Sequence, residues 1–152
     1  RRSLDNLPYI TIPEELLTPP AQASEDVLTL YETLRQLSAK KIVNLNGKTN
    51  TDLKLAYGAA SLAALTEFDE NYNTLICTIA KLGKLLCDQS EAKAAIDILL
   101  FGIRCESDIT DNYTLLVPLL KETNDSSSLT EVYQKLATLP EGSRKRIKEK
   151  LS

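Results

Sequence analysis

The chain offers few side chains that could carry out chemistry, and histidine is absent from all 152 residues. Histidine is the usual general base near neutral pH and the commonest zinc ligand, so its absence removes most hydrolase and metal-site schemes. The sequence also lacks a phosphate-binding or dinucleotide-binding glycine loop, a Cys-x-x-Cys pair and a calcium-binding loop. We therefore expect no catalytic residue, no cofactor and no metal site.

Two local patterns have the spacing of a reactive site. Ser90 and Lys93 have the Ser-x-x-Lys spacing of penicillin-recognising enzymes, but the companion motifs of those enzymes are absent and Ser90 also suits a helix cap. Glu67, Asp69 and Glu70 could offer oxygens to a cation, but they lie at an expected helix end, where carboxylates are normally solvated. We interpret both patterns as structural.

The three cysteines, Cys77, Cys87 and Cys105, are an odd number that fits poorly with a secreted disulfide framework. We interpret them as small buried hydrophobic residues, which favours a reducing, cytoplasm-type environment. Cys77 and Cys87 would lie about 15 Å apart along one helix, too far for a bridge. A pair between Cys77 and Cys105 remains open.

The charge distribution gives no general attraction to nucleic acid, because the net charge is −3. Five cations between Arg144 and Lys150 make the C-terminal stretch basic, and we favour a solvated terminal helix over contact with nucleic acid or acidic lipid. No window approaches the roughly 18 apolar residues of a membrane span, so we expect a soluble domain. The chain begins with Arg1 and contains no Met, which predicts a fragment or processed product and leaves a membrane anchor before Arg1 open.

Residues 1–23 contain four of the six prolines, so they predict an extended arm or tether with one short turn at residues 14–17. Apolar residues at helical spacing follow in residues 24–152, and strand-like runs are almost absent. We therefore predict an all-α domain. The expected helices are 25–41, 51–68, 72–87, 91–105, 111–122, 128–139 and 144–151.

Polar residues mark the expected helix boundaries. Asp69, Glu70 and Asn71 should separate the second helix from the third, and Pro118 should kink the fifth or shift its start. Val132, Tyr133 and Leu136 should face inward on the sixth helix. The expected N-caps are Ser24, Thr51 or Asp52, Ser90, Ser128 in a capping box with Glu131, and Ser143.

A self-match at an offset of 34 residues runs from about residue 76 to residue 140. Seven positions align with seven others: Ile79, Leu82, Gly83, Leu86, Ala95, Leu99 and Gly102 with Tyr113, Leu116, Val117, Leu120, Leu129, Tyr133 and Leu136. A period of this length with two helices per unit is typical of α-helical repeat arrays, in which each helix pair buries its apolar face against a neighbour. The first unit resembles the tetratricopeptide repeat (TPR) in its Leu82-Gly83, Ala95 and Leu99. The second unit is degenerate.

The resemblance implies a right-handed α-solenoid of stacked antiparallel helix pairs, with about three irregular pairs and a C-terminal capping helix in residues 24–152. In the first pair, Leu30, Tyr31 and Leu34 would belong to the first helix and Ser61, Leu65 and Phe68 to the second, with an insertion looped out between them. A generic helical bundle is the alternative.

In TPR-like arrays the first helix of each pair lines a concave groove that binds peptides. By resemblance, the groove would be lined by Cys77, Ala80, Lys84 and Cys87, and by Asp111, Thr114, Pro118 and Lys121. The Asn and Arg residues with which some members bind a peptide carboxylate are missing, so that activity is not implied here.

Three functions follow, in order of preference. The first is a non-enzymatic module that binds a peptide or protein of unknown identity in the groove. The second is a structural or regulatory domain of a larger, membrane-anchored protein, acting through self-association. The third is an enzyme of unfamiliar type, which a deep pocket with convergent polar groups would favour.

Overall fold

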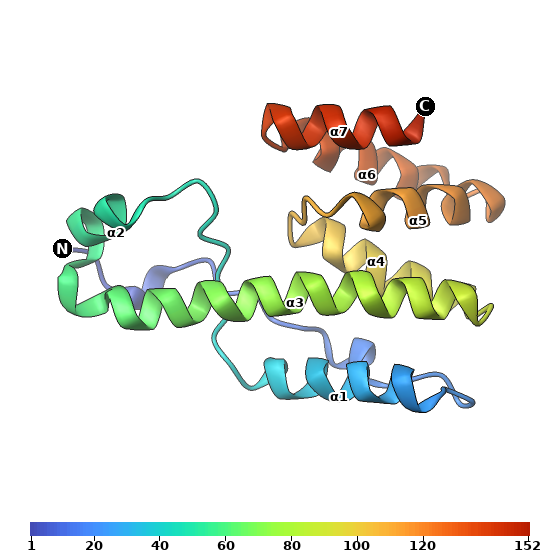
Figure 1. Cartoon of the computed structure of the whole chain (residues 1–152), viewed down its shortest axis with the longest axis horizontal. Helices are drawn as coiled ribbons and strands as arrows, with labels where there is room; N and C mark the ends of the chain where they lie inside the picture. Colours follow the sequence, from blue (N-terminus) through green and yellow to red (C-terminus); the bar gives the residue numbers. More distant parts are fainter.

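A computed structural model describes residues 1–152 and shows an all-helical chain without strands (Figure 1). Three short 3₁₀-helices, η1 to η3, accompany seven α-helices. The 3₁₀-helices are η1 (Leu4–Asn6), η2 (Glu14–Leu17) and η3 (Ala59–Ser61). The α-helices are α1 (Glu25–Ser38), α2 (Asn50–Tyr57), α3 (Leu62–Asp88), α4 (Ala92–Arg104), α5 (Thr110–Glu122), α6 (Ser126–Thr138) and α7 (Glu141–Leu151).

Helix α1 begins where the sequence predicts it. The Ser24 hydroxyl accepts a hydrogen bond from the Val27 N–H at 3.3 Å, and Glu25 and Asp26 place negative charge in the first turn. Val27, Tyr31, Leu34 and Leu37 form the buried face.

The predicted division of residues 51–87 is wrong. Helix α2 is capped by Thr49 in a capping box with Asp52, and it ends at Gly58, whose φ of 88° lies in the left-handed region. Helix α3 then runs unbroken through 27 residues, across the polar stretch 69–71. The polar stretch does not end the helix, because the buried stripe continues past it from Phe68 to Tyr72. Residues 62–68 therefore belong to the start of α3, and they do not form a separate partner for α1.

The turns after α3, α4 and α5 share one geometry. Ser90, Glu106 and Asn124 each adopt a left-handed φ, between 54° and 65°. The N–H of the following residue donates to a carbonyl five residues earlier in each turn: Glu91 to Leu86, Ser107 to Gly102 and Asp125 to Leu120. Ser90 is thus a turn residue and not the predicted N-cap of α4. The first and third turns are 34 residues apart, which is the sequence period.

The caps of the last two helices also differ from prediction. Asp125, not Ser128, caps α6, because its carboxylate accepts the Ser128 N–H at 3.1 Å. Pro140, not Ser143, precedes α7.

Pro118 lies inside a continuous α5. Tyr133, predicted to face inward, is 43% exposed.

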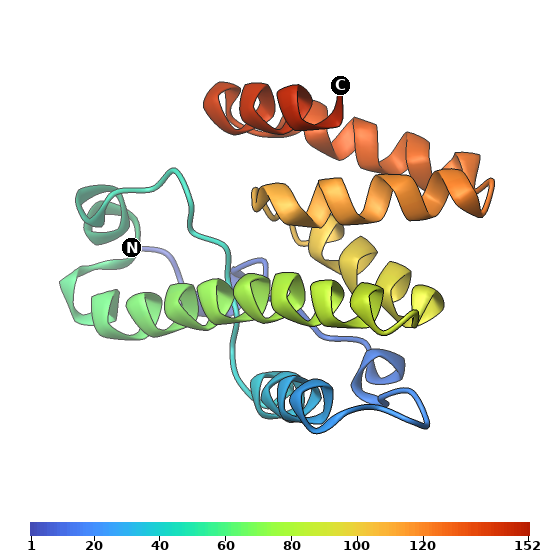
Figure 2. The ribbon, with the colours of Figure 1, turned by 45° about the vertical axis from the view of Figure 1, so that its right-hand side comes forward.

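The helices pack in one stack with α1 and α7 at opposite ends, as Figures 1 and 2 show from two directions. Helix α3 contacts α1, α4 and α5, and α5 in turn contacts α4, α6 and α7. One main core extends through these helices, from Val27 of α1 to Ile147 of α7. A second, smaller core joins α2 to the start of α3.

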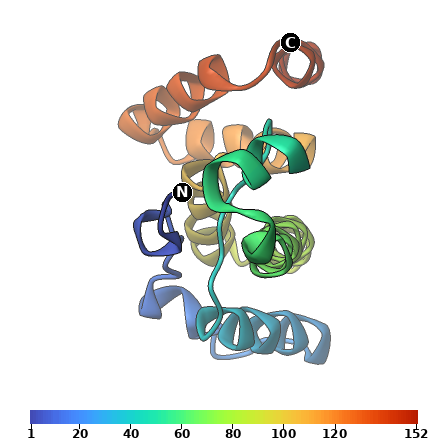
Figure 3. The ribbon, with the colours of Figure 1, turned by 90° about the vertical axis from the view of Figure 1, so that its left-hand side faces the viewer.

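Residues 1–23 lie against the domain over much of their length. The predicted turn at residues 14–17 is present as η2, which packs against α1. Ile12 is buried in the main core and Leu7 in the smaller one, and the Ile10 N–H donates to the Ile42 carbonyl at 2.8 Å. The segment thus contributes to both cores. Figure 3 shows the path of its backbone, in dark blue and blue, along the stack.

Candidate functional site

Two adjoining depressions lie over α1, α3 and α5, and together we call them the groove. Their volumes are about 420 and 460 Å³, and they are adjacent, since Leu30 and Lys81 line both. The first is completed by Ala80, Lys84, Leu85 and Asp111. The second is completed by Thr33, Asn73, Thr74, Cys77 and Thr78.

The structure brings four of the predicted groove residues together. Ala80, Lys84 and Asp111 line the first depression and Cys77 lines the second. The other predicted residues, Cys87, Thr114, Pro118 and Lys121, line neither depression. Lys121 lies in the last turn of α5, ten residues and therefore about 15 Å along the helix from Asp111.

Leu30 and Lys81 line both depressions of the groove, and neither was among the predicted groove residues. Val27, Tyr31 and Leu34 form the buried face of α1. Leu30 lies at the edge of that face and is half-buried. Lys81 lies four residues after Cys77 and therefore on the same side of α3. The helical spacing from Cys77 could have identified Lys81.

The charges in the groove are arranged asymmetrically. The Lys84 ammonium donates to both carboxylate oxygens of Asp88, at 3.0 and 3.2 Å, so its charge is partly satisfied within α3. Lys81 is exposed and forms no ion pair, and neither does Asp111. Leu30, Ala80 and Leu85 supply apolar surface between these charges. The groove can therefore hold an apolar side chain and pair a neighbouring carboxylate with Lys81.

A third depression of about 410 Å³ meets the groove at Asn73. The loop before α2, the turn before α5 and the link before α7 also contribute to it. Its polar lining includes Asn44, Asn46, Glu106 and Asp108. The carboxamides of this lining can donate and accept hydrogen bonds at once.

Ser90 and Lys93, which have the spacing of a reactive site, lie outside the groove. Lys93 donates to Asp97 at 2.9 Å, and Ser90 forms the turn before α4. Cys77, Cys87 and Cys105 are all free thiols, with Cys77 exposed and Cys105 buried. Burial raises the pKa of Cys105 to about 12. No group of three or more Cys, Asp or Glu side chains could hold a metal ion.

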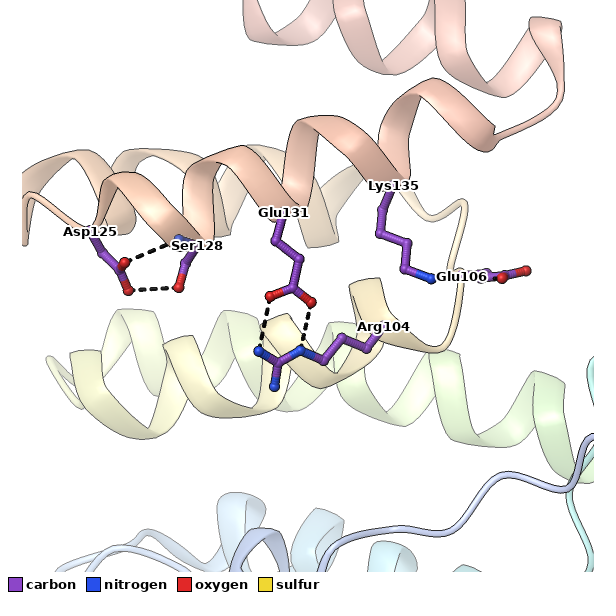
Figure 4. A network of polar contacts seen from close by, with 6 residues as sticks. All are labelled: Arg104, Glu106, Asp125, Ser128, Glu131 and Lys135. Carbon is purple, nitrogen blue, oxygen red and sulfur yellow. Dashed lines mark hydrogen bonds and ion pairs between the residues drawn. The ribbon is translucent and has the colours of Figure 1, made fainter.

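A polar network joins α6 to α4 and to the turn that follows α4 (Figure 4). The Arg104 guanidinium donates to both oxygens of Glu131, at 2.7 and 2.9 Å. These hydrogen bonds lower the pKa of Glu131. The Lys135 Nζ of α6 lies 3.8 Å from the Oε1 of Glu106, which belongs to the turn between α4 and α5. These contacts therefore hold α6 against α4.

Two of the five cations in the basic C-terminal stretch have structural roles. Arg144 donates to the Leu139 carbonyl at 3.1 Å. Arg146 donates to the Thr110 hydroxyl and the Asp108 carbonyl, each at 3.1 Å. These contacts fasten α7 to the stack, which leaves Lys145, Lys148 and Lys150 as its exposed cations without an ion pair.

None of the helices is both long and apolar enough to cross a lipid bilayer. Comparisons of the chain with protein-family models, with curated proteins and with solved structures found no match.

Proposed function

We propose that this chain is a non-enzymatic, TPR-like interaction module that binds a peptide segment of a partner protein in the groove over α1, α3 and α5. One observation carries the proposal: the same depression is lined by Ala80, Lys84 and Asp111 and by the half-buried Leu30. These residues come from three helices that are far apart in the sequence. Such a surface is formed only by the folded stack.

The repeat character of the stack supports the comparison with TPR-like arrays. Leu82 and Leu86 align with Leu116 and Leu120 at the 34-residue offset and all four lie in the main core, and α3 packs against α4 and α5. In such arrays short helices present an extended surface for binding. The proposal therefore extends to a solenoid of helix pairs in which α1, α3 and α5 line the binding surface.

The groove favours a peptide with an apolar residue beside an acidic one. Leu30 and Leu85 would contact the apolar side chain, while the free ammonium of Lys81 would pair with the carboxylate. An ion pair at the surface contributes little to the free energy of binding, and the partly exposed apolar contact adds to it. A single site of this size therefore predicts weak and reversible binding.

Selection from a displayed peptide library on the native chain tests this proposal. Enriched peptides should combine apolar and acidic residues and should bind the Lys81→Glu, Lys84→Glu variant at least tenfold more weakly, because two charges are reversed beside the ligand. The Lys145→Glu, Lys148→Glu variant is the control, since it has the same change in net charge on α7. Equal binding to native chain and groove variant, or enrichment of basic peptides, would contradict the proposal.

A further inference from the structure

The lobe formed by α2, η3 and the start of α3 has a surface that the groove does not use. It projects from the stack at the N-terminal end of α3, and Figure 3 views the molecule from that side, with α2 and the start of the chain toward the viewer. The lobe has its own small core, which includes Leu53, Leu65 and Phe68. We call the group formed by Arg1, Arg2, Lys54 and Leu55 the basic tip.

Backbone and side-chain contacts bring the members of the basic tip together. The Arg2 N–H donates to the Ala56 carbonyl at 2.7 Å, directly beside Leu55. The Arg1 side chain lies over Gly58, because a Cβ at that position would be 3.1 Å from Arg1 Cδ. Both arginines therefore lie at the C-terminal end of α2, where positive charge is favourable.

Leu55 is 79% exposed, whereas the next most exposed large apolar residues, Leu28 and Tyr133, are 46% and 43% exposed. The side of α2 that packs on the lobe core carries Leu53, so Leu55 adds nothing to that core. Exposed Ala59 and Ala60 follow it after Gly58. The tip thus presents an aliphatic side chain and small apolar residues to solvent.

The positive charge of the lobe gathers at its tip, in a chain whose net charge is −3. Residues 1–9 and 44–61 carry four cations, Arg1, Arg2, Lys48 and Lys54, against Asp5 and Asp52, whereas Glu67, Asp69 and Glu70 follow on α3. None of these cations forms an ion pair. The one acidic residue of α2 is Asp52, whose carboxylate accepts the Thr49 N–H at 2.9 Å in the first turn.

We propose that the basic tip is a peripheral binding site for an anionic phospholipid surface, independent of the groove. An exposed aliphatic side chain on a helix whose end carries unpaired cations matches the boundary between headgroups and acyl chains of such a surface. Nucleic acid would suit the cations but not Leu55, and it favours exposed aromatic rings for stacking. In this lobe Tyr57 is half-buried and Tyr9 packs edge-on against Phe68. One leucine and three cations give reversible contact that salt weakens.

Co-sedimentation with phosphatidylcholine vesicles, with and without phosphatidylserine, tests this site. The native chain should sediment only with the anionic vesicles and less at high salt. The Arg2→Glu, Lys54→Glu variant should bind them at least tenfold more weakly, since each cation near such a surface contributes about as much as a severalfold change in affinity. The Lys145→Glu, Lys148→Glu variant changes the net charge by the same amount, but on α7. It should bind the anionic vesicles as the native chain does.

Leu55→Glu and Leu28→Glu form a second matched pair, in which only the first should reduce binding. Circular dichroism confirms that each variant is folded, and Leu55 is exposed enough for its substitution to leave the fold intact. Three results would overturn the proposal: no sedimentation with anionic vesicles at low salt, equal sedimentation with neutral vesicles, or equal loss in the α7 control. Binding of a nucleic acid duplex that the tip variant loses, without binding to vesicles, would also overturn it.

Discussion

Leu99 of α4 lies directly on Gly83 of α3. A Cβ at position 83 would be 2.7 Å from Leu99 Cγ, closer than carbon atoms approach in folded proteins. Both residues are buried, and both belong to the 34-residue repeat. The absence of a side chain at Gly83 therefore allows α3 and α4 to pack closely.

We expect Gly83→Ala to destabilise the chain by about 1–3 kcal/mol, because the added methyl group overpacks the contact with Leu99. Gly142→Ala is the control, since nothing lies within 4 Å of a Cβ there. In the helix α7 that substitution should stabilise by roughly 0.5–1 kcal/mol. Urea denaturation measures both effects. A neutral Gly83→Ala would show that the contact is not tight.

Asn112 of α5 is fully buried, and neither its amide nitrogen nor its amide oxygen has a hydrogen-bond partner. An unpaired buried amide costs about 1–3 kcal/mol, which offsets the packing that the side chain provides. Asn112→Ala should therefore change the free energy of unfolding by less than about 1 kcal/mol, whereas Leu116→Ala in the same helix should cost about 2–5 kcal/mol.

The Asn112 amide nitrogen would lie 2.6 Å from a Cβ at Gly102. Gly102→Ala should thus destabilise the native chain by about 1–3 kcal/mol and cost less in the Asn112→Ala background. A double-mutant cycle in urea measures the coupling. Equal costs in the two backgrounds would contradict this contact.

Alkylation should distinguish the three cysteines. Cys77 is exposed and should react first at mildly alkaline pH. Cys87 should react more slowly, because it is half-buried and burial raises its pKa. Cys105 should react only on unfolding, since burial raises its pKa to about 12. Mass spectrometry over time measures the order, and a fast phase that survives Cys77→Ser would refute it.

The contact between Arg104 and Glu131 should make stability depend on pH. The hydrogen bonds from Arg104 lower the pKa of Glu131 in the folded chain. The stabilisation is therefore present above the ordinary value near 4.5 and is lost as the pH falls through the lowered pKa. Glu131→Gln should cost up to about 1 kcal/mol at neutral pH, and the difference should disappear in strong acid.

Urea denaturation across a pH series checks this expectation, with exposed and unpaired Glu70→Gln as the control. A cost of Glu131→Gln that is as large in acid as at neutral pH would mean that packing, and not charge, is responsible.

The all-helical fold and the cap of α1 could be predicted, because helical spacing and a good N-cap at Ser24 agree. The predicted break at residues 69–71 is wrong, because the apolar stripe that continues from Phe68 to Tyr72 outweighs the local polarity of these three residues. The cap at Ser90 was wrong for another reason. A serine suits a cap or a turn equally in sequence, and only the hydrogen bonds of the folded turn distinguish them.

Part of the groove could be predicted for similar reasons. The repeat places Cys77, Ala80 and Lys84 along one side of a helix, which spacing alone can show. The contribution of Leu30 depends on how α1 packs on α3, and this arrangement is not encoded in the 34-residue period. Cys87 and Lys121 were included by extending the pattern to helix ends that lie beyond the depressions.

The most direct test of the groove is the alkylation rate of Cys77 with and without a saturating peptide selected on the native chain. If the peptide occupies the groove, it should slow alkylation of Cys77 severalfold and leave the slower rate of Cys87 unchanged. An unchanged Cys77 rate at saturation would show that the peptide binds elsewhere and would contradict the proposed function.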